Sequence, residues 1–195
     1  MSIYTGVNNT AKKVSAIYAG VNGTARKVVS AYAGDENGVA KLVYTTYNVP
    51  VSFPTYTSAN SKITYSDQYN AKTRAAWRAF DKNTSNSWWS SADSALPHWI
   101  QYDFGYLVWA KYLDFWNTGT SYTPAKSCTL LGSTNGSTFE EILTHTFENQ
   151  TGQQQTVEIS GKAIYRYYRF RVNSVWNSNR YGQVMEWDIR GFKQP

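Results

Sequence analysis

Cysteine, histidine and long apolar segments are scarce in this sequence, and each scarcity excludes a class of protein. Cys128 is the single cysteine, which excludes an internal disulfide and a cysteine-based metal cluster. His98 and His145 are the two histidines, too few for a histidine-based zinc site. No apolar run approaches the roughly 18 residues of a membrane span, and residues 1–4 lack the basic and apolar segments of a signal peptide. We therefore expect no membrane insertion and no signal peptide.

Charge is also low and evenly spread. Charged residues make up 16% of the 195 residues, the formal net charge is +6, and no basic run is longer than a pair. Proteins that bind nucleic acid concentrate basic residues on one face. We therefore expect no nucleic-acid partner.

The usual catalytic motifs are missing as well. Glycosidases need two carboxyl groups roughly 5–10 Å apart, whereas the side chains of adjacent Glu140 and Glu141 diverge if their segment is a strand. A nucleophilic serine in a G-x-S-x-G motif is absent too. We expect no enzyme activity.

Aromatic residues are abundant. They reach 16% of the chain, with 8 Trp and 16 Tyr, and hydrophobic residues reach 42%. Such a chain can bury a core, and an aromatic-rich, weakly charged composition is typical of β proteins that present stacking surfaces. We therefore predict an all-β protein.

Residues 1–46 contain a threefold repeat. Tyr4, Tyr18 and Tyr32 stand 14 residues apart, and each precedes an Asn-Asn or Asn-Gly pair, at 8–9, 22–23 and 37–38. Asn-Gly tolerates the positive φ angles of a two-residue turn, so the repeats predict three short β-hairpins. Isolated hairpins are marginal in water, and we interpret the segment as a spacer or as the interface of a homo-oligomer. A ligand-binding role is the alternative. These repeats resemble those in tail proteins of phages and prophages of Gram-positive bacteria.

Residues 47–52, with Pro50, have the character of a linker, and a different pattern begins at residue 53. Apolar and basic residues alternate over 167–172, which predicts a strand with one buried face. Asn135-Gly136 separates two apolar runs and indicates a hairpin. Only residues 71–80 favour a helical turn. Residues 53–195 are therefore predicted to form an antiparallel β-sandwich, or jelly roll.

Five motifs follow one another in this region: AWRAFDKN at 76–83, HWIQYDFG at 98–105, LLGSTNGSTFEEI at 130–142, YYRFRV at 167–172 and QVMEWDIRGF at 183–192. Their order resembles that of discoidin or coagulation-factor C-type (F5/8 type C, galactose-binding-like) domains, and most closely the family-32 carbohydrate-binding modules. The resemblance implies a jelly roll. Because this fold carries binders of sugars, lipids and proteins, the ligand has to be argued from the site.

The resemblance also implies a structural calcium ion. In this family a Phe-Asp-Gly-Asn loop wraps the ion, helped by a glutamate of the last strand, and oxygen ligands suit a hard cation. Lys82 stands where the family usually has Gly, and Asn86 where it usually has Thr. A loop held by hydrogen bonds to Asp81 alone is the alternative. The matching metal ligands are Asp81, Asn83, Asn86 and Glu186.

Sugars present flat C–H faces and rings of hydroxyls, so a sugar site pairs exposed aromatic rings with a few polar groups. Segments 116–122, 175–181 and, more weakly, 89–93 combine these residue types, and the resemblance places all three at one end of the sandwich. The arginine that this family usually carries near 116–117 is missing, so Asn117 or Arg180 is expected to replace it. The predicted carbohydrate-binding residues are Trp89, Asp93, Trp116, Asn117, Tyr122, Trp176, Asn177, Arg180 and Tyr181.

These observations predict a non-catalytic carbohydrate-binding module. The repeats favour a phage or prophage tail protein that attaches to cell-surface or cell-wall polysaccharide, located in the virion tail or outside the cell. The alternatives are a targeting module of a secreted glycosidase, a discoidin-type protein–protein adhesion domain and a purely structural tail component.

Overall fold

The fold was analysed in a computed structural model of the chain, which describes residues 4–7, 10–13, 18–21, 24–27, 30–34, 40–45, 49–91, 95–118, 123–177 and 181–194. Side chains are described from residue 49 onward. The chain divides into two compact units, Met1–Val49 and Pro50–Pro195. The described part contains no helix with the length and hydrophobicity that a bilayer crossing needs.

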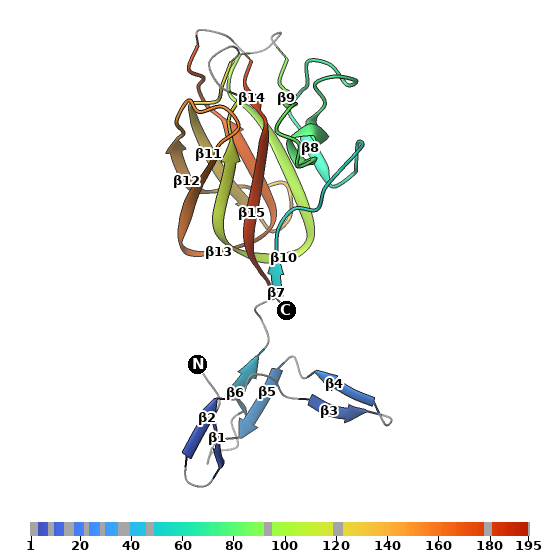
Figure 1. Cartoon of the computed structure of the whole chain (residues 1–195), viewed down its shortest axis with the longest axis vertical. Helices are drawn as coiled ribbons and strands as arrows, with labels where there is room; N and C mark the ends of the chain where they lie inside the picture. Colours follow the sequence, from blue (N-terminus) through green and yellow to red (C-terminus); the bar gives the residue numbers. More distant parts are fainter. Residues whose placement is uncertain are drawn as a thin grey trace. The chain divides into compact units, whose positions relative to one another are not determined.

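The first unit contains three separate antiparallel hairpins, as the repeats predict (Figure 1). Val7 pairs with Thr10 and Val21 with Thr24, so two residues separate the paired ends in the first two hairpins. The predicted turns at 8–9, 22–23 and 37–38 lie outside the described residues. The strands are β1 (Tyr4–Val7), β2 (Thr10–Lys13), β3 (Tyr18–Val21), β4 (Thr24–Lys27), β5 (Ser30–Gly34) and β6 (Ala40–Thr45).

The second unit is built on a seven-stranded sheet in the order β12-β11-β13-β10-β15-β7, with β8 paired to β10. A separate two-stranded sheet joins β9 to β14. The elements are β7 (Val49–Val51), β8 (Ile63–Tyr65), the 3₁₀ helix η1 (Ala76–Phe80), β9 (Trp88–Trp89), β10 (His98–Trp116), β11 (Ser127–Ser133), β12 (Glu140–Thr146), β13 (Gln154–Val172), β14 (Gln183–Val184) and β15 (Glu186–Lys193).

Two bent strands turn this sheet into a sandwich. β10 and β13 have 19 residues each and pair from end to end, with interruptions at register shifts between Asp103 and Val108 and between Ala110 and Tyr112. Near the first shift, Gly105 has a φ of +77°, a conformation that favours glycine. Both strands double back here (Figure 1), so their halves belong to opposite layers. The predicted antiparallel jelly roll is therefore confirmed, and the apolar segments 99–104 and 112–116 belong to one continuous bent strand.

Aromatic rings fill the space between the layers. Phe53 contacts Phe80, Tyr102, Phe104 and Trp187, with ring centroids 4.5–5.3 Å apart. Burying such rings supplies most of the energy that holds the two layers together.

Two local predictions agree with the structure. Residues 71–80 contain η1, and Asn135-Gly136 lies in the β11–β12 connection, with a φ of +77° at Gly136. Cys128 is buried, and burial raises the pKa of its thiol well above the usual value.

Candidate functional site

The predicted sugar-binding segments adjoin one end of the sandwich. Because β10 (His98–Trp116) doubles back, both of its ends lie at the end of the sandwich that carries β9 and β14 (Figure 1). Trp89 pairs with Gln183 across the small sheet at the same end.

Trp89 is the centre of an aromatic group at this end. Its indole lies nearly parallel to the Tyr181 ring, with centroids 5.8 Å apart and planes 12° apart. The Tyr69 ring lies 6.0 Å from Trp89 and 6.4 Å from Tyr181. The Arg74 guanidinium carbon lies 4.2 Å from the centre of the Trp89 ring, within cation–π range. We call Tyr69, Arg74, Trp89 and Tyr181 the rim cluster.

The backbone around the rim cluster is fixed by hydrogen bonds. Tyr69 N donates to Trp89 O at 2.9 Å, and Trp89 N donates to Arg74 O at 3.3 Å. The Trp89 indole N–H donates to Ser87 Oγ at 2.8 Å. The rings are therefore held in place before a ligand arrives, which lowers the entropy cost of binding.

Asp67 ties the loop that carries Tyr69 to the rest of the sandwich. Its carboxylate accepts from Ser91 N and contacts His98 Nδ1, both at 2.7 Å. Its carbonyl accepts from the indole of Trp88, which is fully buried. His98 and Trp88 therefore help to hold this loop against the sandwich.

Tyr69 and Arg74 are not among the carbohydrate-binding residues predicted from the sequence. Tyr69 is 60% exposed, and its neighbours Gln68 and Asn70 satisfy the same criterion of an aromatic ring beside amides in a loop. That criterion would have identified it. Nothing local in the sequence places Arg74 against Trp89, because the contact depends on the fold of the intervening loop.

Trp176 also presents part of its indole to solvent, with 39% of the residue exposed. Its indole N–H donates to Phe147 O at 3.1 Å, and Lys126 Nζ lies 4.5 Å from the ring centre. Its backbone N–H donates to Pro124 O. Among the described residues, no ring contact joins Trp176 or Trp116 to the rim cluster.

Trp116 ends β10, where it pairs with Gln154 and Glu186, and it is half-buried. Asn177 is exposed. The other predicted residues of these segments, Asp93, Tyr122 and Arg180, lie outside the described residues.

Asn117 is not available to a ligand, so the prediction that it contacts the sugar is wrong. The residue is fully buried. Its amide nitrogen donates to Ala125 O at 2.9 Å and Glu148 O at 3.1 Å, and its amide oxygen accepts from Thr118 N at 3.0 Å. Asn117 therefore clamps three backbone segments together.

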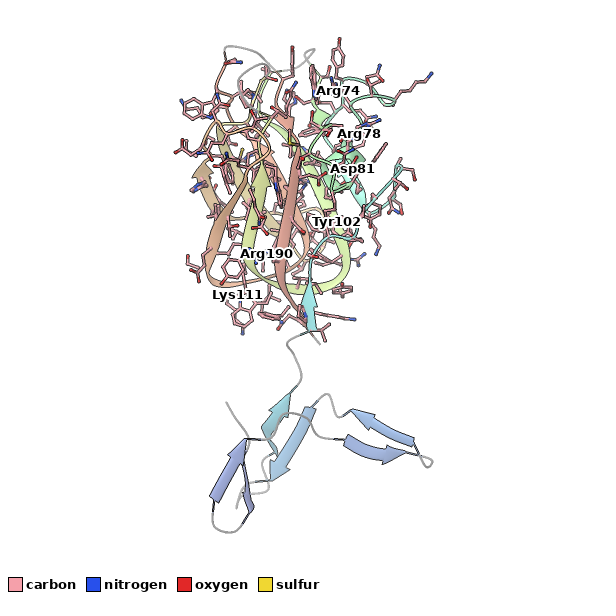
Figure 2. The ribbon with its side chains drawn as sticks, in the orientation of Figure 1. Arg74, Arg78, Asp81, Tyr102, Lys111 and Arg190 are labelled. Atoms are coloured by element: carbon pink, nitrogen blue, oxygen red, sulfur yellow. The ribbon has the colours of Figure 1, made fainter. Side chains whose placement is uncertain are left out.

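The predicted metal loop follows η1 and comes close to β15. Asn86 Nδ2 donates to Asp81 Oδ2 at 3.0 Å, and Asn83 N donates to Asp81 Oδ1 at 2.9 Å and to Glu186 Oε1 at 3.1 Å. Burial, together with the neighbouring Asp81 carboxylate, raises the pKa of Glu186 to about 9. The amide oxygen of Asn83 accepts from Ser85 N. Figure 2 shows Asp81 on the same side of the sandwich as Arg74 and Arg78.

The oxygen atoms of this loop fit a hard cation. Glu186 Oε2 and Asn86 Oδ1 are buried without a hydrogen-bond partner among the described residues, although buried polar atoms are nearly always satisfied. No group of three or more His, Cys, Asp or Glu side chains gathers in the described part of the chain. The ion would therefore be held by Asp81 and Glu186, with Asn86 and backbone oxygens completing an oxygen shell.

Lys82 adopts a backbone conformation that favours glycine and directs its charge to the Asp188 carboxylate. Its φ is +59°, in the left-handed region that costs a non-glycine residue about 1–2 kcal/mol. Its Nζ lies 2.7 Å from Asp188 Oδ2, while Asp188 Oδ1 accepts from Phe53 N.

We expect Lys82→Gly to be more stable than Lys82→Ala. Both variants lose the ion pair with Asp188, but only alanine is strained at positive φ, so the free energies of unfolding differ by about 1 kcal/mol. Thermal melts of the two variants measure this as a difference of about 2–4 °C. Equal melting temperatures would show that the backbone at Lys82 is not strained.

Comparison with known proteins shows which domains this chain is similar to. Residues 78–170 match the F5/8 type C family described as "NedA-like, galactose-binding domain". No curated protein matches the sequence.

Several solved structures share the fold. The CpGH89 CBM32-5 module from Clostridium perfringens, in complex with GalNAc-β-1,3-galactose, has a TM-score of 0.59 and 14% identity, covering 66% of this chain and 93% of that chain. The family-32 module of C. perfringens NanJ, in complex with galactose, has a TM-score of 0.59 and 13% identity, covering 73% and 99%. The C-terminal domain of a Bacteroides fragilis chitobiase has a TM-score of 0.58 and 18% identity, covering 69% and 97%.

These comparisons establish the fold. The sandwich has the fold of galactose-binding-like domains, residues 78–170 are similar to the F5/8 type C family, and the structural neighbours include family-32 carbohydrate-binding modules. This part of the predicted resemblance is confirmed, whereas the likeness of the N-terminal repeats to tail proteins stays a prediction.

Proposed function

We propose that the protein is a non-catalytic carbohydrate-binding module that holds a glycan at the rim cluster. The observation that carries this proposal is the gathering of Tyr69, Trp89 and Tyr181, with Arg74, at a loop-bearing end of the sandwich. Aromatic rings held beside a few polar groups suit the flat faces and hydroxyls of a sugar. The neighbours that contain GalNAc-β-1,3-galactose and galactose support the same class of ligand.

A panel of immobilised glycans tests this proposal with the full chain. The panel contains galactose- and GalNAc-terminated glycans, uronic-acid polymers, and cell-wall polysaccharides of Gram-positive bacteria. We expect retention on at least one of them, with dissociation constants near the millimolar to micromolar range of shallow sites. A protein that is folded by circular dichroism and is retained on none of them would contradict the proposal.

We propose in addition that calcium stabilises the loop formed by Asp81, Asn86 and Glu186. The unsatisfied oxygens of Glu186 and Asn86 support this. The ion would join η1 and the following loop to β15, so its role is structural.

Calcium should therefore raise the melting temperature of protein stripped by a chelator. At a calcium concentration 100 times the dissociation constant the stabilisation is about 2.7 kcal/mol, which is about 5–10 °C for a chain of this size. Asp81→Ala should abolish the shift. Identical melts with and without calcium, for the unmodified chain, would contradict the proposed ion.

We propose that the module serves attachment to host cell-surface or cell-wall polysaccharide as part of a phage or prophage tail, in the virion or outside the cell. The tandem hairpins that precede the domain support this proposal. Joining several chains through the repeats into a homo-oligomer would raise the avidity of a weak site. Light scattering of the full chain should then give a multiple of 22.1 kDa, and a monomeric mass at micromolar concentration would contradict the oligomer.

Targeting of a glycoside-degrading enzyme is the second candidate. It is favoured by neighbours that are parts of enzymes, including a structure of truncated AlyQ with CBM32 and alginate lyase domains, which has a TM-score of 0.56 and 16% identity over 76% of this chain and 35% of that chain. A catalytic domain encoded in the same reading frame would support the targeting of an enzyme. Genes for tail proteins on either side would support attachment to a host.

A further inference from the structure

We infer that the glycan held at the rim cluster is anionic, and that Arg74 binds its carboxylate or phosphate oxygens. This inference rests on the proposed function and specifies the class of its ligand. The observation behind it is a cation within the rim cluster, because the Arg74 guanidinium carbon lies 4.2 Å from the Trp89 ring centre.

Arg74 is charged and has no carboxylate partner among the described residues. The described ion pairs join Lys82 to Asp188, His98 to Asp67, Arg166 to Asp103 and Arg190 to Asp114. The nearest acidic residues along the chain are engaged elsewhere, because Asp67 holds Ser91 and His98 and Asp81 holds Asn83 and Asn86. The guanidinium therefore retains its donors for a ligand.

Arg74 is also positioned in advance. Its backbone N–H donates to Asn70 O at 2.9 Å, and Asn70 Oδ1 accepts from Lys72 N and Thr73 N in the same turn. A guanidinium that rests on an indole keeps its planar set of N–H donors, which matches the two oxygens of a carboxylate or phosphate. Figure 2 shows Arg74 nearer than Arg78 to the end of the sandwich that carries β9.

The exposed indole of Trp176 has a cation as well, since Lys126 Nζ lies 4.5 Å from its ring centre. In the part of the chain that the structure describes, no ring contact joins this indole to another aromatic residue, whereas Arg74 lies against a group of three rings. We therefore assign the anion to Arg74 and not to Lys126.

The test compares Arg74→Gln with Arg78→Gln in the full chain. Arg78 is the matched control because its guanidinium also lies over an indole, 4.7 Å from the Trp77 ring centre, outside the rim cluster. The probes are polygalacturonate, which carries carboxylates, poly(glycerol phosphate), and a neutral galactan. Each variant lowers the net charge by one. If the binding were only a non-specific attraction to the net charge, both variants would therefore lose the same affinity for the anionic polymers.

We expect the unmodified chain and Arg78→Gln to prefer one or both anionic polymers over galactan. Arg74→Gln should bind the preferred anionic polymer about tenfold or more weakly, whereas its affinity for galactan should fall by a clearly smaller factor. A preference for polygalacturonate would identify the bound group as a carboxylate, and a preference for poly(glycerol phosphate) would identify it as a phosphate. Salt should weaken the anionic binding of the unmodified chain, because screening lowers the attraction.

Two results would overturn the inference and leave the proposed function standing: equal or better binding of galactan by the unmodified chain, or an equal loss for Arg74→Gln and Arg78→Gln. Absence of binding to every saccharide would remove the proposed function and the inference together. Melting temperatures of both variants, expected within a few degrees of the unmodified chain, separate loss of binding from loss of fold.

Discussion

Replacing Trp89 with alanine should abolish most of the glycan binding. The indole contacts Tyr69, Tyr181 and Arg74, so its removal eliminates one ring and the support of the three remaining side chains. Truncation of a central aromatic residue in a binding site typically costs about 2 kcal/mol or more, which is about 30-fold in affinity. The measurement is the dissociation constant for the best-retained glycan of the panel, by calorimetry.

Trp109→Ala is the matched control for this experiment. Trp109 is also a half-buried tryptophan with a cation over its ring, since Lys111 Nζ lies 4.7 Å from the ring centre. It pairs with Ile164 and Phe192, away from the rim cluster. Its replacement should leave the affinity unchanged. If Trp89→Ala and the unmodified chain bind the glycan with equal affinity, the rim cluster is not the glycan-binding site.

Asn117→Ala should destabilise the fold strongly. The variant loses two hydrogen bonds donated to Ala125 O and Glu148 O and one accepted from Thr118 N, in a fully buried place. Unsatisfied buried groups and lost hydrogen bonds together cost about 3 kcal/mol, which lowers the melting temperature by about 6–12 °C. Thermal unfolding followed by circular dichroism measures the change.

An exposed amide gives the reference for this loss of stability. Gln153 is exposed, and Gln153→Ala should change the stability by no more than about 0.5 kcal/mol. If Asn117→Ala instead melts like the unmodified chain and loses only glycan affinity, Asn117 is a ligand contact and the clamp is refuted.

The fold was predictable because its signals are local. Each signal depends only on neighbouring residues: the alternation of apolar and basic residues over 167–172, the Asn135-Gly136 turn and the short apolar runs. The structure has strands and a hairpin at these positions. The bend of β10 was not predictable in the same way. Its two halves read as separate strands, since the register shift between Asp103 and Val108 becomes visible only through the pairing with β13.

The candidate site was only partly predictable, because its contacts join distant segments. The aromatic residues Trp89 and Tyr181 were identified from composition, but their contact at 5.8 Å depends on the pairing of β9 with β14. Asn117 follows an exposed-looking aromatic residue in sequence, and nothing local shows that its amide faces Ala125 and Glu148. Amides suit both buried clamps and sugar hydroxyls, so burial decides between the two roles.

The indole N–H resonances of the full chain provide the most direct measurement of where a glycan binds. Trp89→Phe and Trp109→Phe assign the two signals, and the chain is then titrated with galactose and with galacturonate oligomers. We predict that the Trp89 signal shifts with saturation, since its N–H lies in the rim cluster and bonds to Ser87, while the Trp109 signal stays unchanged. A saturable shift at Trp109 with none at Trp89 would contradict a glycan site at the rim cluster.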